Sequence, residues 1–197
     1  MSQVELNWHA KSPDEIEGDN LLVTGQDSFH EAHAHSWKMR LEPDGSLTHL
    51  TGSAPTVIAQ APRLCRDAIR EGEFDRARET FAQTFSHYSL DLSCPWHLTR
   101  TLTAEQHKGG ELDLAKANGK YLPASVEPLP LADPKSLYHS AVLQAERTYR
   151  THVTALEQVQ APDGKIPDPA LARAILADAA GFGLSVALYM WRWMAGA

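Results

Sequence analysis

Five side chains that can bind a metal ion follow one another in a short part of this chain. They are His87, Asp91, His97, His107 and Glu111. His87 and Asp91 are four residues apart, as are His107 and Glu111, so on a helix each pair projects from one face. A solvated helix face would explain either pair alone, but not five ligands in this order. Imidazole and carboxylate together suit Zn²⁺, and the absence of clustered Cys favours a catalytic site over a closed structural one. The pattern predicts helices around a metal centre and points to metal-assisted hydrolysis.

The hydrophobic pattern predicts an all-α fold. Apolar residues recur at helical spacing in four segments, which are 56–72, 73–94, 134–158 and 168–195. The last segment is apolar almost all round, which indicates a helix at the centre of a bundle. Only WKMRLE and SLTHLTG, which flank a Pro-Asp-Gly turn, indicate β structure, as a small hairpin. We expect residues 1–197 to form a single domain, a multi-helix bundle with an irregular or hairpin segment near the N-terminus.

The net charge and the hydropathy of the chain restrict which partners it is expected to bind. A net charge of −7 disfavours stable binding of duplex nucleic acid through phosphate contacts. The longest apolar stretch, GFGLSVALYMW, is shorter than the roughly 20 residues needed to cross a bilayer, so we expect no transmembrane segment. No signal peptide is recognisable, so the chain as given is expected to be cytoplasmic, and secreted or periplasmic if it has been trimmed. Cys65 and Cys94 are too few for a disulfide framework and are expected to be a core thiol and a loop thiol.

The metal-ligand segment resembles the zinc-dependent phospholipase C superfamily, which includes single-strand-specific zinc nucleases. That family has a helix with His-x3-Asp, a Pro-containing loop ending in His, and a His-x3-Glu or His-x3-Asp on the next helix. SHYSLDLSCPWH and EQHKGGE match this signature. The Ala-rich helices before it and the His ahead of the turn in HAHSWKMRLEPDG are also similar. The resemblance covers roughly residues 12 to 115 and implies a helical zinc enzyme.

The resemblance also implies a set of metal ligands. His87 and Asp91 would hold one zinc with an upstream histidine, either His33 or His35. On chemical grounds, the Asp91 carboxylate could bridge two metals or bind one of them through both oxygens. The remaining three ligands, His97, His107 and Glu111, would hold a second zinc. The family's third zinc uses the amine of an N-terminal Trp, whereas here Trp8, which is followed by His9, is internal. Two zinc ions are therefore expected, and the third is in doubt.

The expected activity is hydrolysis of a phosphate ester, with a phospholipid or a nucleotide as substrate. A metal pair can lower the pKa of bound water toward about 7, so that a metal-bound hydroxide attacks phosphorus. Asp19 is expected to orient or deprotonate that water, and Asp27 is the weaker candidate. The leading hypothesis is a phospholipase C-like phosphodiesterase. The alternatives are a nuclease-like enzyme and a non-catalytic zinc-binding relative that lacks the third metal.

Several further residues carry local expectations. Gly109-Gly110 costs a helix roughly 1 kcal/mol per glycine, so this pair indicates either a close approach of backbone or substrate, or a loop. Asp178, the lone acid in an apolar helix, is expected to bond a ligand histidine. His139 and His152 are expected to be hydrogen-bonded histidines of the core. Trp191 and Trp193 are expected to be packing residues.

Overall fold

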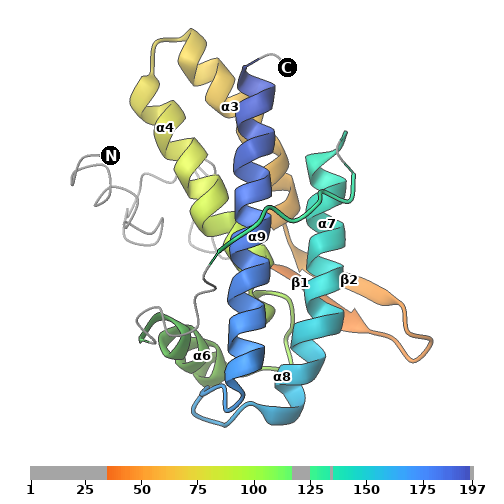
Figure 1. Ribbon diagram of the computed structural model, residues 1–197. Coiled ribbons are helices and arrows are strands. Elements are labelled where there is room, and N and C mark those ends of the chain that lie inside the picture. Colours follow the sequence, from red (N-terminus) through yellow and green to blue (C-terminus); the bar gives the residue numbers. More distant parts are fainter. Residues whose placement is uncertain (1–34, 117–124, 134, 196–197) are drawn as a thin grey trace.

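The computed structural model describes residues 35–116, 125–133 and 135–195, and this part of the chain is mostly helical (Figure 1). The helices are α3 (Ala54–Arg70), α4 (Phe74–Gln83), α5 (Ser89–Leu92), α6 (Ala104–Lys116), α7 (Leu137–Thr148), α8 (Thr154–Val159) and α9 (Pro169–Met194). Two π-helical segments, η2 (Thr84–Tyr88) and η4 (Tyr149–Val153), and a 3-10 turn, η3 (Pro95–His97), connect them. The helical fold class expected from the sequence is confirmed at this level of detail.

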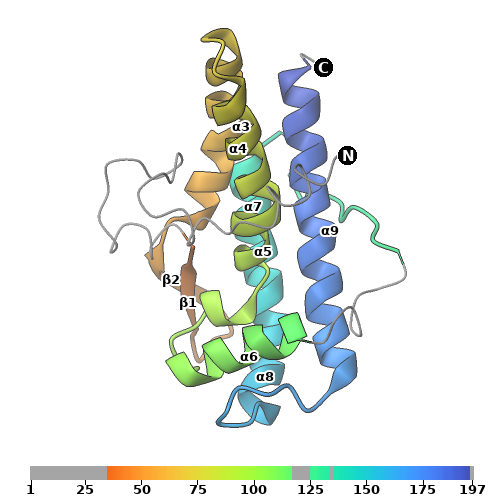
Figure 2. The same ribbon diagram turned by 90° about the vertical axis from the view of Figure 1, so that its left-hand side faces the viewer.

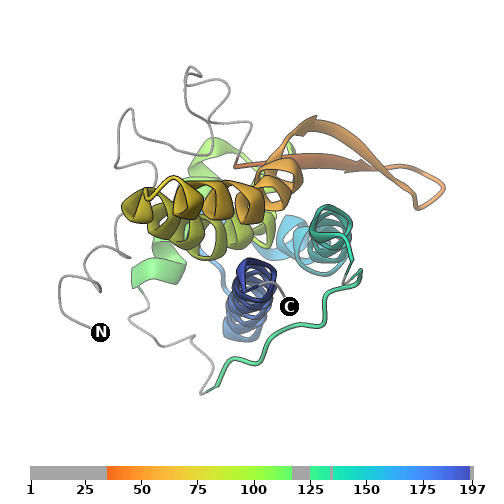
Figure 3. The ribbon, with the colours of Figure 1, turned by 90° about the horizontal axis from the view of Figure 1, so that it is seen from above.

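A two-stranded antiparallel hairpin, β1 (Trp37–Leu41) and β2 (Leu47–Gly52), precedes the helices as expected. Its turn contains Gly45 at a φ of 82°, a conformation that glycine adopts without steric cost. Figure 3 shows the hairpin reaching out from one side of the bundle. Its inner end is fixed to the bundle, because the Met39 amide donates to the Leu98 carbonyl over 2.7 Å. This bond ties β1 to the loop that follows η3.

The main core lies between α3, α5, α7 and α9. Helices α3 and α4 lie side by side, and Figure 1 shows the sharp turn between them. Gly72 makes this turn at a φ of 78°, close to where the sequence pattern predicted the helix to end. The largest completely buried side chains of this core include Tyr88, Phe182, Ile58 and Leu92. Burial of such apolar faces is what holds the helices together.

Helix α9 packs along the bundle on one face and is open on the other (Figure 3). It is long and apolar enough to cross a membrane by length and composition, and 44% of its most apolar window is buried within the protein. The packing role expected for the tryptophans holds for Trp193, whose ring lies 4.1 Å from the Arg66 guanidinium. It is wrong for Trp191, which is 67% exposed because it falls on the open face.

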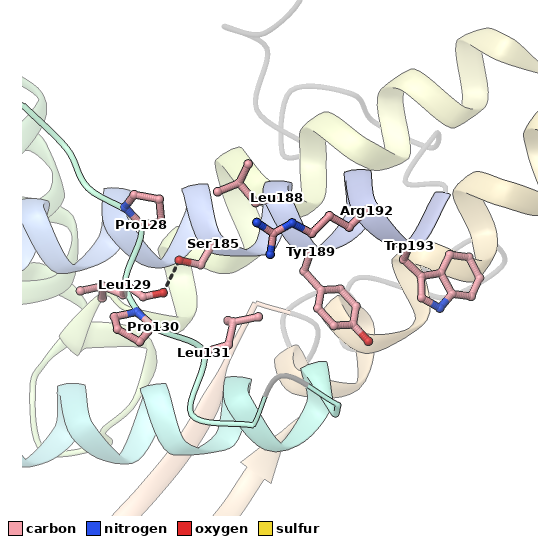
Figure 4. A pocket seen from close by; sticks show the side chains of 9 residues that line it. All are labelled: Pro128, Leu129, Pro130, Leu131, Ser185, Leu188, Tyr189, Arg192 and Trp193. Atoms are coloured by element: carbon pink, nitrogen blue, oxygen red, sulfur yellow. Dashed lines mark hydrogen bonds between the residues drawn. The ribbon is translucent and has the colours of Figure 1, made fainter. Parts of the chain in front are cut away.

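The segment 125–131 runs along α9 without regular structure, and Figure 4 shows it beside the helix. The Leu129 amide donates to the Gly181 carbonyl over 3.1 Å, and the Ser185 hydroxyl donates to the Leu129 carbonyl. A side chain at Gly181 would come within 2.9 Å of Leu129, so glycine permits this close approach. A cavity of about 530 Å³ opens beside this contact, and prolines, leucines and Arg192 contribute to its walls.

Candidate metal centre

The structure gathers six of the predicted ligands, one from the segment before β1 and five from four helical elements, around one cavity of about 510 Å³. Figure 2 shows β1, α5 and α6 together in the lower half of the molecule. His35 precedes β1, His87 lies in η2, Asp91 in α5, His97 in η3, and His107 and Glu111 in α6. The cavity beside α9 is similar in size. The donor atoms, rather than the volume, single out this one as the candidate site.

Three ligand atoms form a first triangle. His35 Nδ1 lies 2.8 Å from Asp91 Oδ2 and 2.7 Å from His87 Nε2, and His87 Nε2 lies 3.1 Å from the same Asp91 oxygen. These side chains are well covered, with between 9% and 15% of each exposed. We call this set, His35, His87 and Asp91, the first triangle.

A second triangle lies next to the first. His97 Nε2 and His107 Nε2 are 3.2 Å apart, and they lie 3.0 and 2.9 Å from Glu111 Oε1. The set of His97, His107 and Glu111 is more open than the first triangle, because the Glu111 side chain is 46% exposed and His107 33%. The centre is therefore reached from the side of α6.

Asp91 links the two triangles. Its Oδ2 belongs to the first triangle, and its Oδ1 lies 3.7 Å from His97 Nε2 in the second. Burial would raise the Asp91 pKa, but the charge of His97 and hydrogen bonds from His35 and His87 hold it well below its ordinary value. Asp91 is therefore a carboxylate at neutral pH, with one oxygen available to each group of ligands.

The carboxylate of Glu111 is kept ionised in the same way. Burial opposes ionisation, but hydrogen bonds from His107 and His97 lower the Glu111 pKa to about 2. His97 shows the reciprocal effect, since its pKa is lowered by burial but raised more by Asp91 and Glu111. A group of imidazoles around two charged carboxylates is the donor set that a divalent cation such as Zn²⁺ prefers.

The chemistry of the donor atoms in each triangle suits a single metal ion better than a set of hydrogen bonds. Two imidazole nitrogens at 2.7 or 3.2 Å share at most one proton, so protonating both would place two N–H groups against each other. One cation accepts all three lone pairs. Ligands of a tetrahedral zinc with bonds of about 2.0–2.2 Å lie about 3.3–3.6 Å apart, so the ligand atoms of each triangle would move apart by a few tenths of an ångström around an ion. The residues present therefore fit a metal ion in each triangle.

The helix that carries His87 departs from α-helical geometry at that residue. The Ser89 amide bonds to the Thr84 carbonyl in a π-helical turn, and the Ser89 hydroxyl donates to the same carbonyl over 2.7 Å. Such one-turn widenings re-aim side chains and are frequent at functional sites. The periodicity predicted a helix from Glu73 almost to Pro95 but gave no signal for this widened turn.

Gly109 and Gly110 let α6 approach its neighbours closely, which confirms one of the two expectations for this pair. A Cβ at Gly110 would overlap the Trp96 indole, and one at Gly109 would overlap the Asp163 carbonyl. Trp96 is buried and its Nε1 donates to Gln160 over 3.0 Å. Because Trp96 directly precedes His97, this close approach brings the turn that carries His97 next to α6.

The hairpin positions His35. Gly52, at a φ of 109°, lies against the Ser36 carbonyl, where any Cβ would clash, and this carbonyl accepts from the Ala54 amide over 3.2 Å. The ring of His35 packs 5.0 Å from that of Tyr88. Ser36 and Lys38, which the sequence reasoning did not identify, also line the cavity. An alternating strand that follows a ligand histidine could have indicated both of them.

Several predicted residues lie outside the part of the chain that the structure describes. They are Trp8, His9, Asp19, Asp27 and His33. Of the two upstream histidines, the structure brings His35 into the cavity. The role expected for Asp19 stays a prediction.

The expectation that Asp178 bonds a ligand histidine is wrong. Asp178 lies 3.0 Å from His152 Nε2 and 3.2 Å from Arg147, and neither residue lines the cavity. His152 is a buried, hydrogen-bonded histidine as expected. His139 is not, because its side chain is 59% exposed and pairs with Asp133 at the surface. Helical periodicity alone could not distinguish the buried histidine, His152, from the exposed one, His139.

No relative assigns this chain to a family. Comparisons with protein-family models, with curated proteins and with solved structures gave no match. The likeness to the phospholipase C superfamily thus stays an expectation from the spacing of the ligands. The structure adds to it that the spaced ligands meet in one cavity as two triangles joined by Asp91.

Proposed function

We propose that this chain is a zinc-dependent hydrolase of phosphate esters, acting on phosphodiesters in the manner of a phospholipase C. The observation that supports this most is the pair of triangles that share Asp91. Two neighbouring metal sites in one open cavity are typical of enzymes that hydrolyse phosphate esters. When bound, such ions act as Lewis acids toward phosphoryl oxygens and lower the pKa of water.

The protein's own residues divide the work. The first triangle is the more covered of the two, and it would hold its ion rigidly against the core through His35 and His87. The second triangle faces solvent through His107 and Glu111, so substrate would enter from the α6 side. Asp91 would fix the spacing between the ions. Asp19 remains the proposed residue that orients the water, by the resemblance.

The local charge suits an anionic substrate even though the whole chain is acidic. Two divalent ions would outweigh the two carboxylates of the cavity, which leaves it positive. Lys38 adds a further positive group to the same wall. A phosphodiester would therefore be attracted to the cavity despite the net charge of −7.

The test combines metal analysis with turnover. Protein purified without chelator is analysed by plasma mass spectrometry, and hydrolysis of bis(4-nitrophenyl) phosphate is followed by absorbance. We expect two zinc ions per chain and turnover that a chelator abolishes. His87→Ala should lose the zinc of the first triangle and, with it, turnover. His139→Ala is the matched control, because it removes an exposed histidine that pairs with Asp133 away from the cavity, and it should retain both.

Other results would direct the proposal elsewhere. Zinc binding without turnover would favour the non-catalytic relative. No zinc after supplementation would contradict the metal centre itself. For an active protein, release of phosphocholine from phosphatidylcholine vesicles would support a lipid substrate, whereas cleavage of a single-stranded oligonucleotide would support the nuclease-like alternative.

A further inference from the structure

Lys38 lines the cavity of the candidate metal centre, although the sequence pattern did not predict it there. Strand β1 alternates its side chains, so Trp37 and Met39 face the core and are 9% and 3% exposed. Ser36 and Lys38 point the other way and line the cavity with all six ligands of the two triangles. The hairpin thus supplies both His35 and a cation to the same site.

The Lys38 ammonium is held in place by the backbone. Its Nζ donates to the Trp96 carbonyl over 2.6 Å, in the turn between Asp91 and His97. Among the described residues, no carboxylate lies within ion-pairing distance of this ammonium. An ammonium has three donors, so two of them remain for a ligand beyond the Trp96 carbonyl.

A partly buried lysine that is not neutralised by a carboxylate is costly, and desolvation by this burial is the largest cause that lowers the Lys38 pKa. An anion entering the cavity would offset that cost. Lys38 could not serve as a metal ligand while it is protonated, because an ammonium has no lone pair. Its chemistry suits the oxygen atoms of an anion that the metal ions also bind.

We propose that Lys38 binds a non-bridging oxygen of the phosphate group in this cavity and so determines that the site takes phosphate esters. This inference rests on the proposed function and adds the contact that recognises the substrate. The Trp96 carbonyl orients the ammonium in the cavity, and the ligands of the two triangles, which line the same cavity, would hold the ions. Lys38 carries charge and a hydrogen bond, with no proton transfer.

The experiment measures binding of inorganic phosphate to the zinc-loaded protein by calorimetry, and inhibition by phosphate of bis(4-nitrophenyl) phosphate hydrolysis. The variants are Lys38→Met, which keeps the aliphatic stem, and Lys38→Arg, which keeps the charge. Lys135→Met, at an exposed lysine of the segment before α7, is the matched control. Zinc content is measured in every variant.

We expect Lys38→Met to weaken phosphate binding by about tenfold or more at unchanged zinc content, as a charge-assisted hydrogen bond is lost. The KM for the diester should rise in parallel. Lys38→Arg should recover most of the affinity, and Lys135→Met should equal the wild type. If Lys38 had only a structural role, Lys38→Met would instead lower the zinc content or the melting temperature, and Lys38→Arg would not restore phosphate affinity.

Two outcomes would overturn the assignment. One is a Lys38→Met protein that binds phosphate as tightly as the wild type, and the other is a zinc-loaded wild type that binds no phosphate. Phosphate binding that depends on Lys38 in a protein without diester turnover would contradict only the proposed hydrolase activity. Failure of the two proposals can therefore be told apart.

Discussion

Replacing Asp91 with alanine should disturb both metal sites at once, because its two oxygens face different triangles. Removing a residue of only one triangle should spare the other. Glu111→Ala should therefore retain one tightly bound zinc, held by His35, His87 and Asp91. Asp91→Ala should retain none at the affinity of the wild type.

The size of the effect follows from the role of the carboxylate. Mutating a group that merely hydrogen-bonds a ligand typically weakens metal binding by about 10- to 100-fold. Asp91 is itself a ligand, and its pKa is held so low that it contributes a full negative charge at neutral pH. We therefore expect at least about 100-fold weaker binding at each site, which is about 2.8 kcal/mol per site.

The assay is competition of each zinc with a chromophoric chelator, together with zinc content per chain. Asp178→Ala is the matched control, because this aspartate also bonds a histidine on a helix but lies outside the cavity. Circular dichroism verifies that each variant is folded. The reasoning is refuted if Asp91→Ala keeps one zinc at wild-type affinity, since Asp91 would then serve a single site.

Three further predictions concern stability and reactivity. Gly110→Ala should lower the melting temperature. Alanine is favoured over glycine in a helix by about 1 kcal/mol, but its Cβ would displace Trp96 at a cost of about 1–3 kcal/mol. A higher melting temperature would disprove this close approach. Asp178→Asn should lower the free energy of unfolding, measured in urea at pH 7, by about 1 kcal/mol, a value reduced because Asp178 is partly exposed to solvent. The pKa of Asp178 is lowered first by the hydrogen bond from its histidine, so this stability is fully present above its unfolded value and is lost as pH falls below 3.8; a difference that persisted in acid would contradict the cause. The thiols of Cys65 and Cys94 should react slowly with Ellman's reagent at pH 8 until the protein unfolds. Burial raises the pKa of Cys65 to about 12 and is the largest cause of the raised pKa of Cys94. Rapid labelling of the folded protein would contradict this prediction.

Much of the local structure could be predicted because its causes are local. The helical spacing of apolar residues indicated the segments that became α3, α4, α7 and α9, and the Pro-Asp-Gly turn indicated the hairpin. The spacing of His87 with Asp91 and of His107 with Glu111 depends only on helix geometry. These features need no knowledge of how distant segments meet.

The two π-helical turns, by contrast, left no sequence signal. Ser89 stabilises the first of them by donating to the Thr84 carbonyl, but serine in a helix does this in many contexts without widening the turn. In the folded protein, η2 packs against α3 and α9. Local propensity cannot report such packing.

The sequence alone determined which residues of this protein could bind metal and which segments would be helical, because both depend on residue type and short-range spacing. Only the tertiary structure brought His35, 56 residues before Asp91, to within 2.8 Å of it and placed Lys38 in the same cavity. It also paired Asp178 with His152 rather than with a ligand histidine. The physical reason is that long-range contacts are set by how the hairpin docks on the loop after η3 and by how the buried helix faces fit together.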